Sequence, residues 1–555
     1  MLQKIFNLLL FLSLLVFLWF LQTHGLSKIG LQEYDSVKNY FIVKNMAAGD
    51  FTDMFQHGSP TLFLFFAGIY KIFPSHLSLE YVNAALNVAA IAVFTHIFSH
   101  FCQYKFWQRS LLVLYMGSSL YLVYCTRSFA MESMTLFVFA LMLWEYLQIL
   151  LLQKKRETYF WVLTAIMLTI NYKILLLFPL LFVCEMYRLL PISSFFANKK
   201  AQKQKLLHLS ILAIPLILYQ ILGMVLGVSW KSYPAHWVFS LVMRRNLNPW
   251  TEVKTLHFDI SYYFKYLQLF ESPILITALV FFVIFCCYKY FVVVDFSPQK
   301  SDDCKLKSAA TAKFLIILLV IAIFTITEMS ILPKAPRGIL LIFPILYFFA
   351  FEMLQIFYEF LATFKTNKID NLTKNFEKKN NKILANLAFV ITILLLIFYN
   401  YQQIITYIYP YTTTNYPKIT SYLSQNKIDK IAATVGINYK FFLAQHVQNN
   451  SQDNSIISSQ SVDFQTIIFE KDLIALQKQG YEYCLLDDYH KIVGANIFDS
   501  LEQLPAVLSL KESTLCSPLL YLEHCEFTGF TFEEALHVRE KVMQDTIQLK
   551  LIKLK

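Results

Sequence analysis

Long apolar runs recur along the first 410 residues of this 555-residue chain. Most are about 20 residues long, and a helix of that length spans the roughly 30 Å hydrocarbon core of a bilayer. Hydrophobic residues make up 57% of the chain and charged residues only 15%, whereas soluble domains are about 45–50% apolar and about 25% charged. Because a soluble surface must be solvated, this excess excludes a secreted enzyme, a nucleic-acid binder and a disordered scaffold. The pattern predicts a polytopic α-helical membrane protein.

These runs predict about eleven membrane-spanning helices. The first, residues 1–21, is expected to be retained, because no small-residue cleavage site follows it. The run 159–190 is too long for one crossing, so Asn171, Tyr172 and Lys173 are expected to form a hairpin tip between two short spans. The other predicted spans are residues 79–98, 110–124, 131–152, 206–228, 274–294, 314–329, 338–361 and 383–404.

The basic residues decide the predicted orientation. With eleven spans and the N-terminus inside, every inside loop carries Lys or Arg, as the positive-inside rule requires. A twelfth candidate, residues 61–73, would reverse everything after it, so it is expected to lie at the outer interface. We therefore predict an inner-membrane protein with a cytoplasmic N-terminus and a periplasmic or otherwise extracytoplasmic C-terminal tail. The basic inside-loop residues are Lys105, Arg109, Lys154, Lys155, Arg156, Arg188, Lys199, Lys200, Lys203, Lys205, Lys300, Lys305, Lys307, Lys313, Lys365, Lys368, Lys374, Lys378, Lys379 and Lys382.

Two domains are predicted: a membrane domain over residues 1–410, with an outer loop at 22–77, and a soluble α/β domain over 411–555. In the soluble domain, residues 463–479 have the pattern of an amphipathic helix that ends at Gly480.

Three further elements of this tail have recognisable patterns. Residues 481–486 are typical of a strand, and alternation at Ile547, Leu549 and Leu551 predicts a second, half-buried strand. Thr531 and Glu534 form a capping box that predicts a helix start.

Nine cysteines are present, and none of them has metal-site spacing. Most are interpreted as small buried hydrophobic residues. Cys484, Cys516 and Cys525 lie in the polar tail, where one disulfide can form if the compartment is oxidising.

The first outer loop carries an acid close to the membrane surface. Asp35 follows the first span within Tyr34-Asp35-Ser36. A carboxylate there could act as a general base on an acceptor hydroxyl beside a lipid-borne substrate. The alternative is a solvated loop acid.

Further charged residues stand at outer span ends. Arg127 and Glu132 flank a junction of two spans, where ionisable groups are costly unless paired or solvated. A pair that only holds the loop together is the alternative. Lys173 stands at the hairpin tip, and its alternative role is a lysine that reaches the lipid headgroups.

Lys334 and Arg337 precede the tenth predicted span, in a short segment bounded by Leu332 and Gly338. Two cations suit a phosphate, because Arg offers a two-pronged fork and Lys a point charge; contact with lipid headgroups is the alternative. Cations for a phosphate and an acid for a base, all on one side of the membrane, indicate transfer from a lipid phosphate.

The order of these segments resembles the GT-C superfamily of membrane glycosyltransferases, especially the branch of protein O-mannosyltransferases and bacterial aminoarabinose transferases. Asp35 and Tyr40 match the first outer loop of that family, and Gly49-Asp50 matches a segment that follows. His57-Gly58-Ser59-Pro60 is similar to the family's helix start, although Ser36 replaces the family's second acid.

The resemblance extends over roughly the first 400 residues and not over the tail. Arg127 and Glu132 match an Arg and an acid after the third span, with Glu where Asp is usual. Lys173 matches a turn in the middle spans. Lys334 and Arg337 match a Lys-x-x-Arg segment that precedes a helix proline, here Pro344; Gly338 replaces the family's Tyr.

This resemblance implies a transferase that uses a sugar linked to a polyprenyl phosphate. Asp35 would deprotonate the acceptor, with Glu132 as the second catalytic candidate. The residues holding the donor phosphate would be Lys334, Arg337 and Lys173, and those orienting the substrates would be Arg127, Tyr40 and His57.

The expected partners are a polyprenyl-phosphate sugar donor and membrane lipid, with no nucleic acid. No metal or other cofactor is expected, although some GT-C relatives use a divalent cation between loop acids. The sequence does not identify the sugar, nor whether the acceptor is a glycolipid, a cell-surface glycan or a protein.

The alternative function is a polytopic transporter or lipid-linked-sugar flippase, which would place ionisable residues at mid-bilayer in broken helices. A membrane-anchored binding protein would not need eleven spans.

Overall fold

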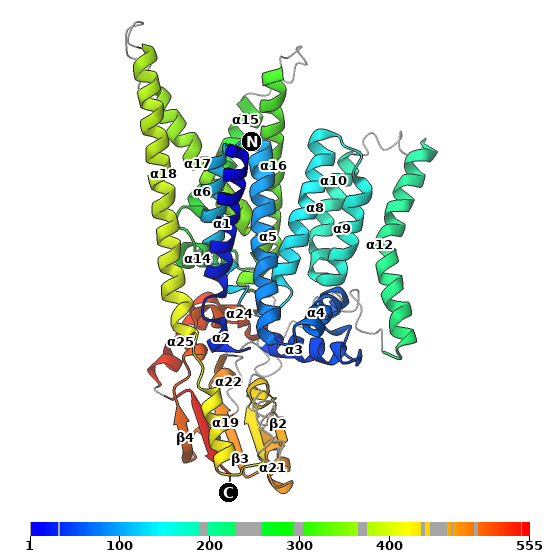
Figure 1. The fold of residues 1–555 in the computed structure, drawn as a ribbon, viewed down its shortest axis with the longest axis vertical. Helices are drawn as coiled ribbons and strands as arrows, with labels where there is room; N and C mark the ends of the chain where they lie inside the picture. Colours follow the sequence, from blue (N-terminus) through cyan, green and yellow to red (C-terminus); the bar gives the residue numbers. More distant parts are fainter. Residues whose placement is uncertain are drawn as a thin grey trace.

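A computed structural model of the chain describes residues 2–31, 34–188, 198–228, 257–292, 303–364, 374–434, 439–444, 463–467, 470–492, 498–545 and 547–554. Its long helices form an upright bundle, and a five-stranded sheet lies beyond one end of that bundle (Figure 1). The N-terminus lies at the opposite end of the bundle from the sheet, which is the arrangement that an odd number of crossings produces. The predicted fold class, a helical membrane domain followed by an α/β domain, is confirmed.

Each of the eleven predicted spans is helical over most of its length. Within the described chain, seven helices are long and apolar enough to cross a membrane, and three more apolar helices are shorter. The number of crossings and the orientation stay predictions. The bundle helices are α1 (Leu2–Thr23), α5 (His76–Cys102), α6 (Phe106–Gly117), α7 (Leu120–Tyr124), α8 (Glu132–Leu152), α9 (Glu157–Ile170), α10 (Phe178–Arg188), α12 (Lys199–Val225), α15 (Leu275–Val292), α16 (Asp303–Met329), α17 (Phe343–Phe364) and α18 (Lys374–Tyr407).

One predicted span is broken into α6 and α7, and a buried carboxylate stabilises the break. Backbone groups freed inside a membrane domain need partners, because lipid offers none. Glu271, which follows α14 (Ser261–Phe270), accepts the N–H groups of Leu120 at 3.3 Å and Tyr121 at 2.8 Å. The Ser119 hydroxyl also donates to it. Glu271 therefore caps the start of α7.

The predicted interface helix is α4 (Pro60–Ile72), which packs against α3 (Tyr34–Ala47) and also against α5 and α9. Figure 1 shows α3 and α4 at the end of the bundle nearest the sheet, lying across it rather than parallel to the upright helices. The predicted outer loop is thus largely helical, with a short helix α2 (Leu26–Ile29) and a 3₁₀ turn η1 (Gln56–Gly58).

The C-terminal sheet has the strand order β2-β1-β3-β5-β4. β1 runs parallel to β2 and β3, whereas β5 runs antiparallel to β3 and β4. The strands are β1 (Lys430–Thr434), β2 (Asp463–Ile467), β3 (Tyr483–Asp487), β4 (Ala506–Leu510) and β5 (Leu549–Lys553). The helices are α19 (Tyr416–Gln425), α21 (Glu470–Lys478), α22 (Tyr489–Ile492), α23 (Asp499–Glu502), α24 (Pro518–Thr528) and α25 (Phe532–Gln544).

The sequence patterns of this domain are mostly confirmed. Thr531 and Glu534 cap α25 reciprocally, with backbone-to-side-chain distances of 2.8 and 3.3 Å. Both predicted strands are present as β3 and β5. The single helix predicted over 463–479 is wrong in its first part, because residues 463–467 form β2 and pair with β1 along their whole length. Gly480, at a positive φ of 86°, ends α21 as expected.

The disulfide considered for the tail does not form. Cys484, Cys516 and Cys525 are all free and buried, so they pack as small hydrophobic residues.

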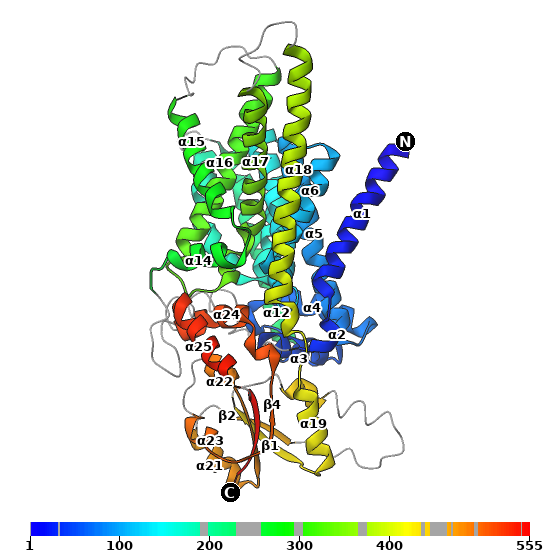
Figure 2. The same cartoon turned by 90° about the vertical axis from the view of Figure 1, so that its left-hand side faces the viewer.

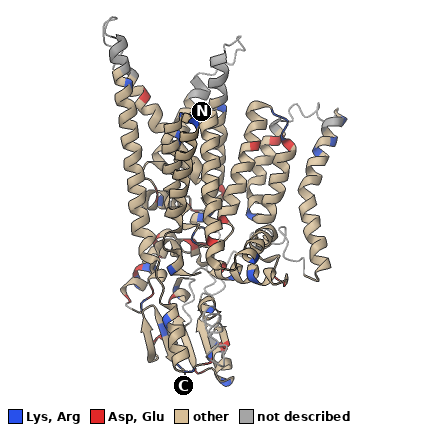
Figure 3. Ribbon diagram, viewed as in Figure 1, with Lys and Arg blue, Asp and Glu red and all other residues tan. Residues whose placement is uncertain are grey.

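Charged residues are sparse along the bundle and gather near its two ends and in the C-terminal domain (Figure 3). Helices α24 and α25 lie between the bundle and the sheet (Figure 2), so the C-terminal domain contributes a helix to the charged end of the bundle. The predicted inside-loop residues Lys300, Lys365 and Lys368, and residues 229–256 of an outer segment, lie outside the described residues.

Candidate functional site

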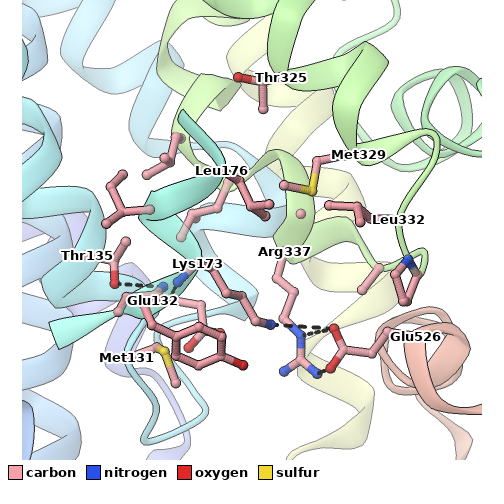
Figure 4. Close-up of a pocket in the computed structure, with 18 of the residues that line it drawn as sticks. Met131, Glu132, Thr135, Lys173, Leu176, Thr325, Met329, Leu332, Arg337 and Glu526 are labelled. Atoms are coloured by element: carbon pink, nitrogen blue, oxygen red, sulfur yellow. Dashed lines mark hydrogen bonds and ion pairs between the residues drawn. The ribbon is translucent and has the colours of Figure 1, made fainter. Parts of the chain in front are cut away.

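A cavity of about 130 Å³ opens where the bundle meets the C-terminal domain. Its walls come from the start of α8, the turn after α9, the end of α16, the 3₁₀ helix η4 (Pro336–Ile342) and α24. Most of the lining is apolar, and the charged groups are Glu132, Lys173, Arg337 and Glu526 (Figure 4). Three of these four are residues that the sequence analysis singled out.

Arg337 enters the cavity because of the loop before it. Pro336 stands at the first position of η4, where a missing N–H costs nothing and the fixed φ suits a helix start. Lys334 is 1% exposed, and its ammonium donates to the carbonyls of His257 and Leu332. Burial lowers the pKa of Lys334 to about 8. Lys334 therefore fastens the loop that presents Arg337.

Lys173 is presented by the predicted hairpin tip, which has the form of a tight 3₁₀ turn, η2 (Tyr172–Leu177). The Asn171 side chain accepts the N–H of Lys173 at 3.0 Å. It also donates to the Thr135 hydroxyl at 3.2 Å, which ties the tip to α8. Asn171 thus fixes the backbone at Lys173 relative to α8.

Two acids from α24 contact Arg337. Glu526 accepts from Arg337 Nη2 at 2.5 Å and from Nε at 3.1 Å, and its Oε2 lies 3.6 Å from Lys173 Nζ. Glu523, one turn earlier, accepts the backbone N–H of Arg337 at 3.2 Å and lies 3.3 Å from Nε. Lys173 and Arg337 therefore converge on the carboxylate of Glu526, as Figure 4 shows.

These contacts give Glu523 and Glu526 different pKa values. Burial raises the pKa of Glu523 to about 7, although the Arg337 charge opposes this. Burial would also raise the pKa of Glu526, but the charges of Arg337 and Lys173 outweigh it and lower that pKa to about 2. Glu526 is consequently ionised at neutral pH, whereas Glu523 is poised near neutrality.

Asp35 approaches Arg337 from the first turn of α3. Its Oδ2 atom lies 3.9 Å from Arg337 Nη1, and its side chain is 26% exposed. Asp35 does not line the cavity itself, but it contacts Arg337, which does. The structure brings Asp35, the predicted base, next to Arg337, a predicted phosphate ligand, although the two residues are far apart in the sequence.

Glu132, the second predicted catalytic acid, lines the cavity from the first position of α8. Its carboxylate interacts electrostatically with Arg337 and Lys173. Its Oε2 atom is buried and has no hydrogen-bond partner among the described residues. This carboxylate oxygen can accept a hydrogen bond from a ligand.

Arg127 and Tyr40, two of the remaining predicted site residues, do not line the cavity. Arg127 donates to the carbonyl of His24 at 2.8 Å and fastens the chain after α1. Tyr40 is buried, and its hydroxyl lies 3.4 Å from that of Tyr70. His57 lies in η1, and its side chain is outside the described part of the structure. Arg127, Tyr40 and Lys334 thus have structural contacts and do not line the cavity.

The acids of α24 were not found by sequence reasoning. Their signal is local and weak: Glu523, His524 and Glu526 interrupt an otherwise apolar helix. His524 is buried, and its ring joins the Leu520 carbonyl to the Tyr489 hydroxyl, both at 2.8 Å. Nothing in the chain before α24 indicates that this helix reaches Arg337.

A second, apolar cavity of about 150 Å³ adjoins the first. It lies among α8, α9, α10 and α16, and Leu177 lines both cavities. Carbon and sulfur side chains dominate its walls, for example Phe139, Met142, Leu181 and Ile317. An apolar space among the bundle helices therefore borders the charged cavity at Leu177.

No group of three or more His, Cys, Asp or Glu within the described ranges is placed to hold a metal ion. That the protein acts without a metal ion stays a prediction.

The fold and the cavity define a polytopic membrane protein with paired cations at one end of its helix bundle. Among solved structures, ArnT from Cupriavidus metallidurans bound to undecaprenyl phosphate matches with a TM-score of 0.51 over 90% of this chain and 96% of that chain, at 11% identity. The apo state of that protein matches at a TM-score of 0.47 and 11% identity, over 88% of this chain and 94% of that chain.

No protein-family model matches this chain, and no curated protein matches it. The likeness to ArnT is therefore one of fold, and it extends over the C-terminal domain as well as the bundle. The predicted resemblance to a GT-C fold is confirmed at that level.

Proposed function

We propose that this chain is a membrane glycosyltransferase that transfers a sugar from a polyprenyl-phosphate donor to an acceptor at the outer face of the inner membrane. In this proposal the N-terminus is cytoplasmic and the C-terminal domain is periplasmic or otherwise extracytoplasmic. The sugar is a hexose or a pentose, and the acceptor is a glycolipid, a cell-surface glycan or a protein.

The observation that carries the proposal is the convergence of Lys173 and Arg337 on one anion position, with Asp35 3.9 Å from the same guanidinium. An Arg fork with a neighbouring ammonium matches the oxygens of a phosphate as well as those of a carboxylate. The carboxylate of Glu526 marks that position.

The lipid part of the donor has a place beside the anion position. The apolar cavity shares Leu177 with the charged one and extends between helices of the bundle. Ligand sites combine apolar walls with a few polar groups that fix orientation. A phosphate near Lys173 with an isoprenoid chain among α8, α10 and α16 follows this pattern, and undecaprenyl phosphate is the lipid bound in the ArnT structure.

The chemistry proposed is a displacement at the anomeric carbon of the sugar. Asp35 takes the proton of the acceptor hydroxyl, whose oxygen bonds to the anomeric carbon. The bond between that carbon and the phosphate oxygen breaks, and polyprenyl phosphate leaves. Lys173 and Arg337 stabilise the charge that develops on the leaving phosphate. Glu132 would accept a hydrogen bond from a sugar hydroxyl.

A transporter or flippase is the alternative. It needs ionisable groups at mid-bilayer that exchange partners during transport. Within the bundle, Glu271 is bonded to the backbone of α7 and Glu352 accepts from Tyr104. The candidate cations instead stand at the end of the bundle, which supports the transferase proposal.

The test combines binding with product analysis. Purified full-length protein in nanodiscs is titrated with undecaprenyl phosphate, and surface glycolipids of a deletion strain are compared by mass spectrometry with those of strains complemented by wild type, Asp35→Asn or Asp53→Asn. Asp53 is an exposed acid after α3 and serves as the matched control. We expect binding, and a glycoform restored by wild type and Asp53→Asn only. Absence of binding, together with unchanged glycoforms in the deletion strain, would reject the proposal.

A further inference from the structure

The anion position between Lys173 and Arg337 is already occupied by a side chain of the C-terminal domain. Glu526 makes a two-pronged contact with the Arg337 guanidinium and lies 3.6 Å from Lys173 Nζ. A planar, bidentate carboxylate between two cations satisfies the same donors that a phosphate would use. The carboxylate and a donor phosphate therefore cannot occupy this position together.

The charges around this position also oppose the binding of a phosphate beside Glu526. Two cations, Lys173 and Arg337, interact with four carboxylates, those of Asp35, Glu132, Glu523 and Glu526. The carboxylates outnumber the cations, and a donor phosphate adds further negative charge to this largely buried cluster, where like charges repel more strongly than in water. Withdrawal of the carboxylate that occupies the anion position therefore favours phosphate binding.

We propose that Glu526 is a displaceable latch: it holds the cation pair when the donor is absent, and the donor phosphate binds by displacing it. This inference rests on the function proposed above and describes how its donor site is regulated. A tethered carboxylate at this position also excludes weakly bound anions, such as the headgroups of the surrounding phospholipids, from the cation pair.

Of the two α24 carboxylates that contact Arg337, Glu526 is better placed to leave. Its side chain is 17% exposed, whereas that of Glu523 is 3% exposed. It lies in the last turn of α24, which ends at Gly529 in the left-handed conformation. Because the charges of Lys173 and Arg337 lower its pKa to about 2, it does not give way by protonation and has to move.

The rest of α24 is anchored, so the movement is confined to its end. The Tyr262 hydroxyl donates to the Leu522 carbonyl at 2.8 Å. His524 is bonded to Tyr489 of α22 at 2.8 Å. Glu523 keeps its contact with the backbone N–H of Arg337. The helix therefore keeps Arg337 in place while its last turn opens.

The test measures the affinity of full-length protein in nanodiscs for undecaprenyl phosphate. Glu526→Gln removes the competing charge, so we expect its dissociation constant to fall by about tenfold or more, the equivalent of a lost charge-assisted contact. Glu533→Gln is the matched control, because Glu533 is an exposed acid of the neighbouring helix that pairs with Lys265. Its affinity should equal that of wild type.

Two further measurements distinguish displacement of Glu526 from a purely structural role of this residue. Glu526→Asp keeps the charge and shortens its reach, and it should bind with intermediate affinity. Hydrogen exchange in the last turn of α24 should become faster in wild type when undecaprenyl phosphate is added. The exchange measurement decides the matter if the Gln variant does not fold.

The outcomes separate this inference from the proposed function. Equal affinities of wild type and Glu526→Gln, or slower exchange in α24 on ligand binding, overturn the latch and leave the donor site standing. Absence of binding in wild type and in every folded variant overturns both proposals. A higher affinity confined to the Glu526 variants supports both.

Discussion

Asp35 Oδ2 lies 3.9 Å from Arg337 Nη1, and this pair joins the first turn of α3 to the start of η4. The acid is partly exposed, and Arg337 also lines the cavity. A hydroxyl that reaches Asp35 from solvent would therefore meet a sugar whose phosphate is held by Arg337. In the proposed reaction, this pair would bring the acceptor hydroxyl and the donor phosphate close to one guanidinium.

Replacing Asp35 by Asn should abolish most transfer and leave donor binding intact. Loss of a general base typically lowers the rate by about 10²–10⁴-fold. The measurement is the initial rate with purified donor, alongside the affinity for undecaprenyl phosphate. Asp53→Asn is the control, because that acid is exposed and does not line the cavity. Full activity of the Asp35→Asn enzyme would transfer the role of base to Glu132.

Lys173 and Lys334 should give opposite results, although both were candidates for the donor phosphate. Lys173→Gln removes a cation of the cavity and should weaken undecaprenyl phosphate binding about tenfold. Lys334→Gln removes donors to two carbonyls of a buried loop and should lower the melting temperature while changing affinity less. The reverse pattern would indicate that Lys334, and not Lys173, binds the donor phosphate.

Local sequence features predicted the helices of the bundle and not the details of their ends. The length and spacing of apolar runs depend on the bilayer alone, so they identify spans without any tertiary information. The break between α6 and α7 was missed, because it is stabilised by Glu271, a residue distant in sequence. Residues 463–467 were misassigned for the same reason, since pairing with β1 overrides the helical pattern.

The candidate site was predicted in part. Glu132, Lys173 and Arg337 were found because charge near an apolar span end is costly and so carries information, and Asp35 because it is an acid in the outer loop after the first span. The sequence does not say where such a side chain points, and Lys334 binds loop carbonyls instead of facing the cavity. The acids of α24 could not be predicted, because their only link to the cations is the docking of the C-terminal domain.

The C-terminal domain should lose stability as the pH rises towards neutrality and above. Asp487, at the end of β3, is fully buried, and burial raises its pKa to about 7 from an ordinary value near 4. The folded state therefore holds a proton that the unfolded state releases. Its contribution is present below about pH 4 and is lost progressively as the pH rises through 7, by about 1.4 kcal/mol for each unit of pKa difference.

Asp487→Asn tests this, because the amide keeps the acceptor for the Tyr489 N–H and can donate to the Tyr416 hydroxyl. The melting temperature of the variant relative to wild type should increase from pH 5 to pH 8. Asp429→Asn, at an exposed position before β1, should follow wild type. A constant difference between Asp487→Asn and wild type across this range would contradict the prediction.

The orientation of the chain can be tested with reporter fusions. A reporter that is active only outside the inner membrane should be active when fused after Ile404, near the end of α18, and silent when fused within residues 365–382. The N-terminus and the sheet lie at opposite ends of the bundle. A fusion that places the sheet outside the membrane therefore also places the N-terminus inside. The opposite result would place the cavity on the cytoplasmic side and exclude an extracytoplasmic acceptor.

Arg337 should bind the donor through its shape as well as its charge. Arg337→Lys keeps the charge and loses the two-pronged geometry, whereas Arg337→Ala loses both. Removing the guanidinium also leaves Glu523 and Glu526 close together without their main partner, and breaking a buried ion pair is destabilising. The series is therefore best measured in the Glu526→Gln protein, where less negative charge is left unpaired.

In that background the affinity for undecaprenyl phosphate should fall in the order Arg, Lys, Ala at position 337. A lost charge-assisted hydrogen bond is worth roughly 1.5–3 kcal/mol, so the Ala protein should bind at least about tenfold more weakly than the Arg protein. If Arg337 only anchored η4 in lipid headgroups, Lys would serve equally well and the three affinities would agree. Agreement among the three folded proteins would leave Lys173 as the cavity cation that holds the phosphate, because Lys334 is already engaged by the carbonyls of its own loop.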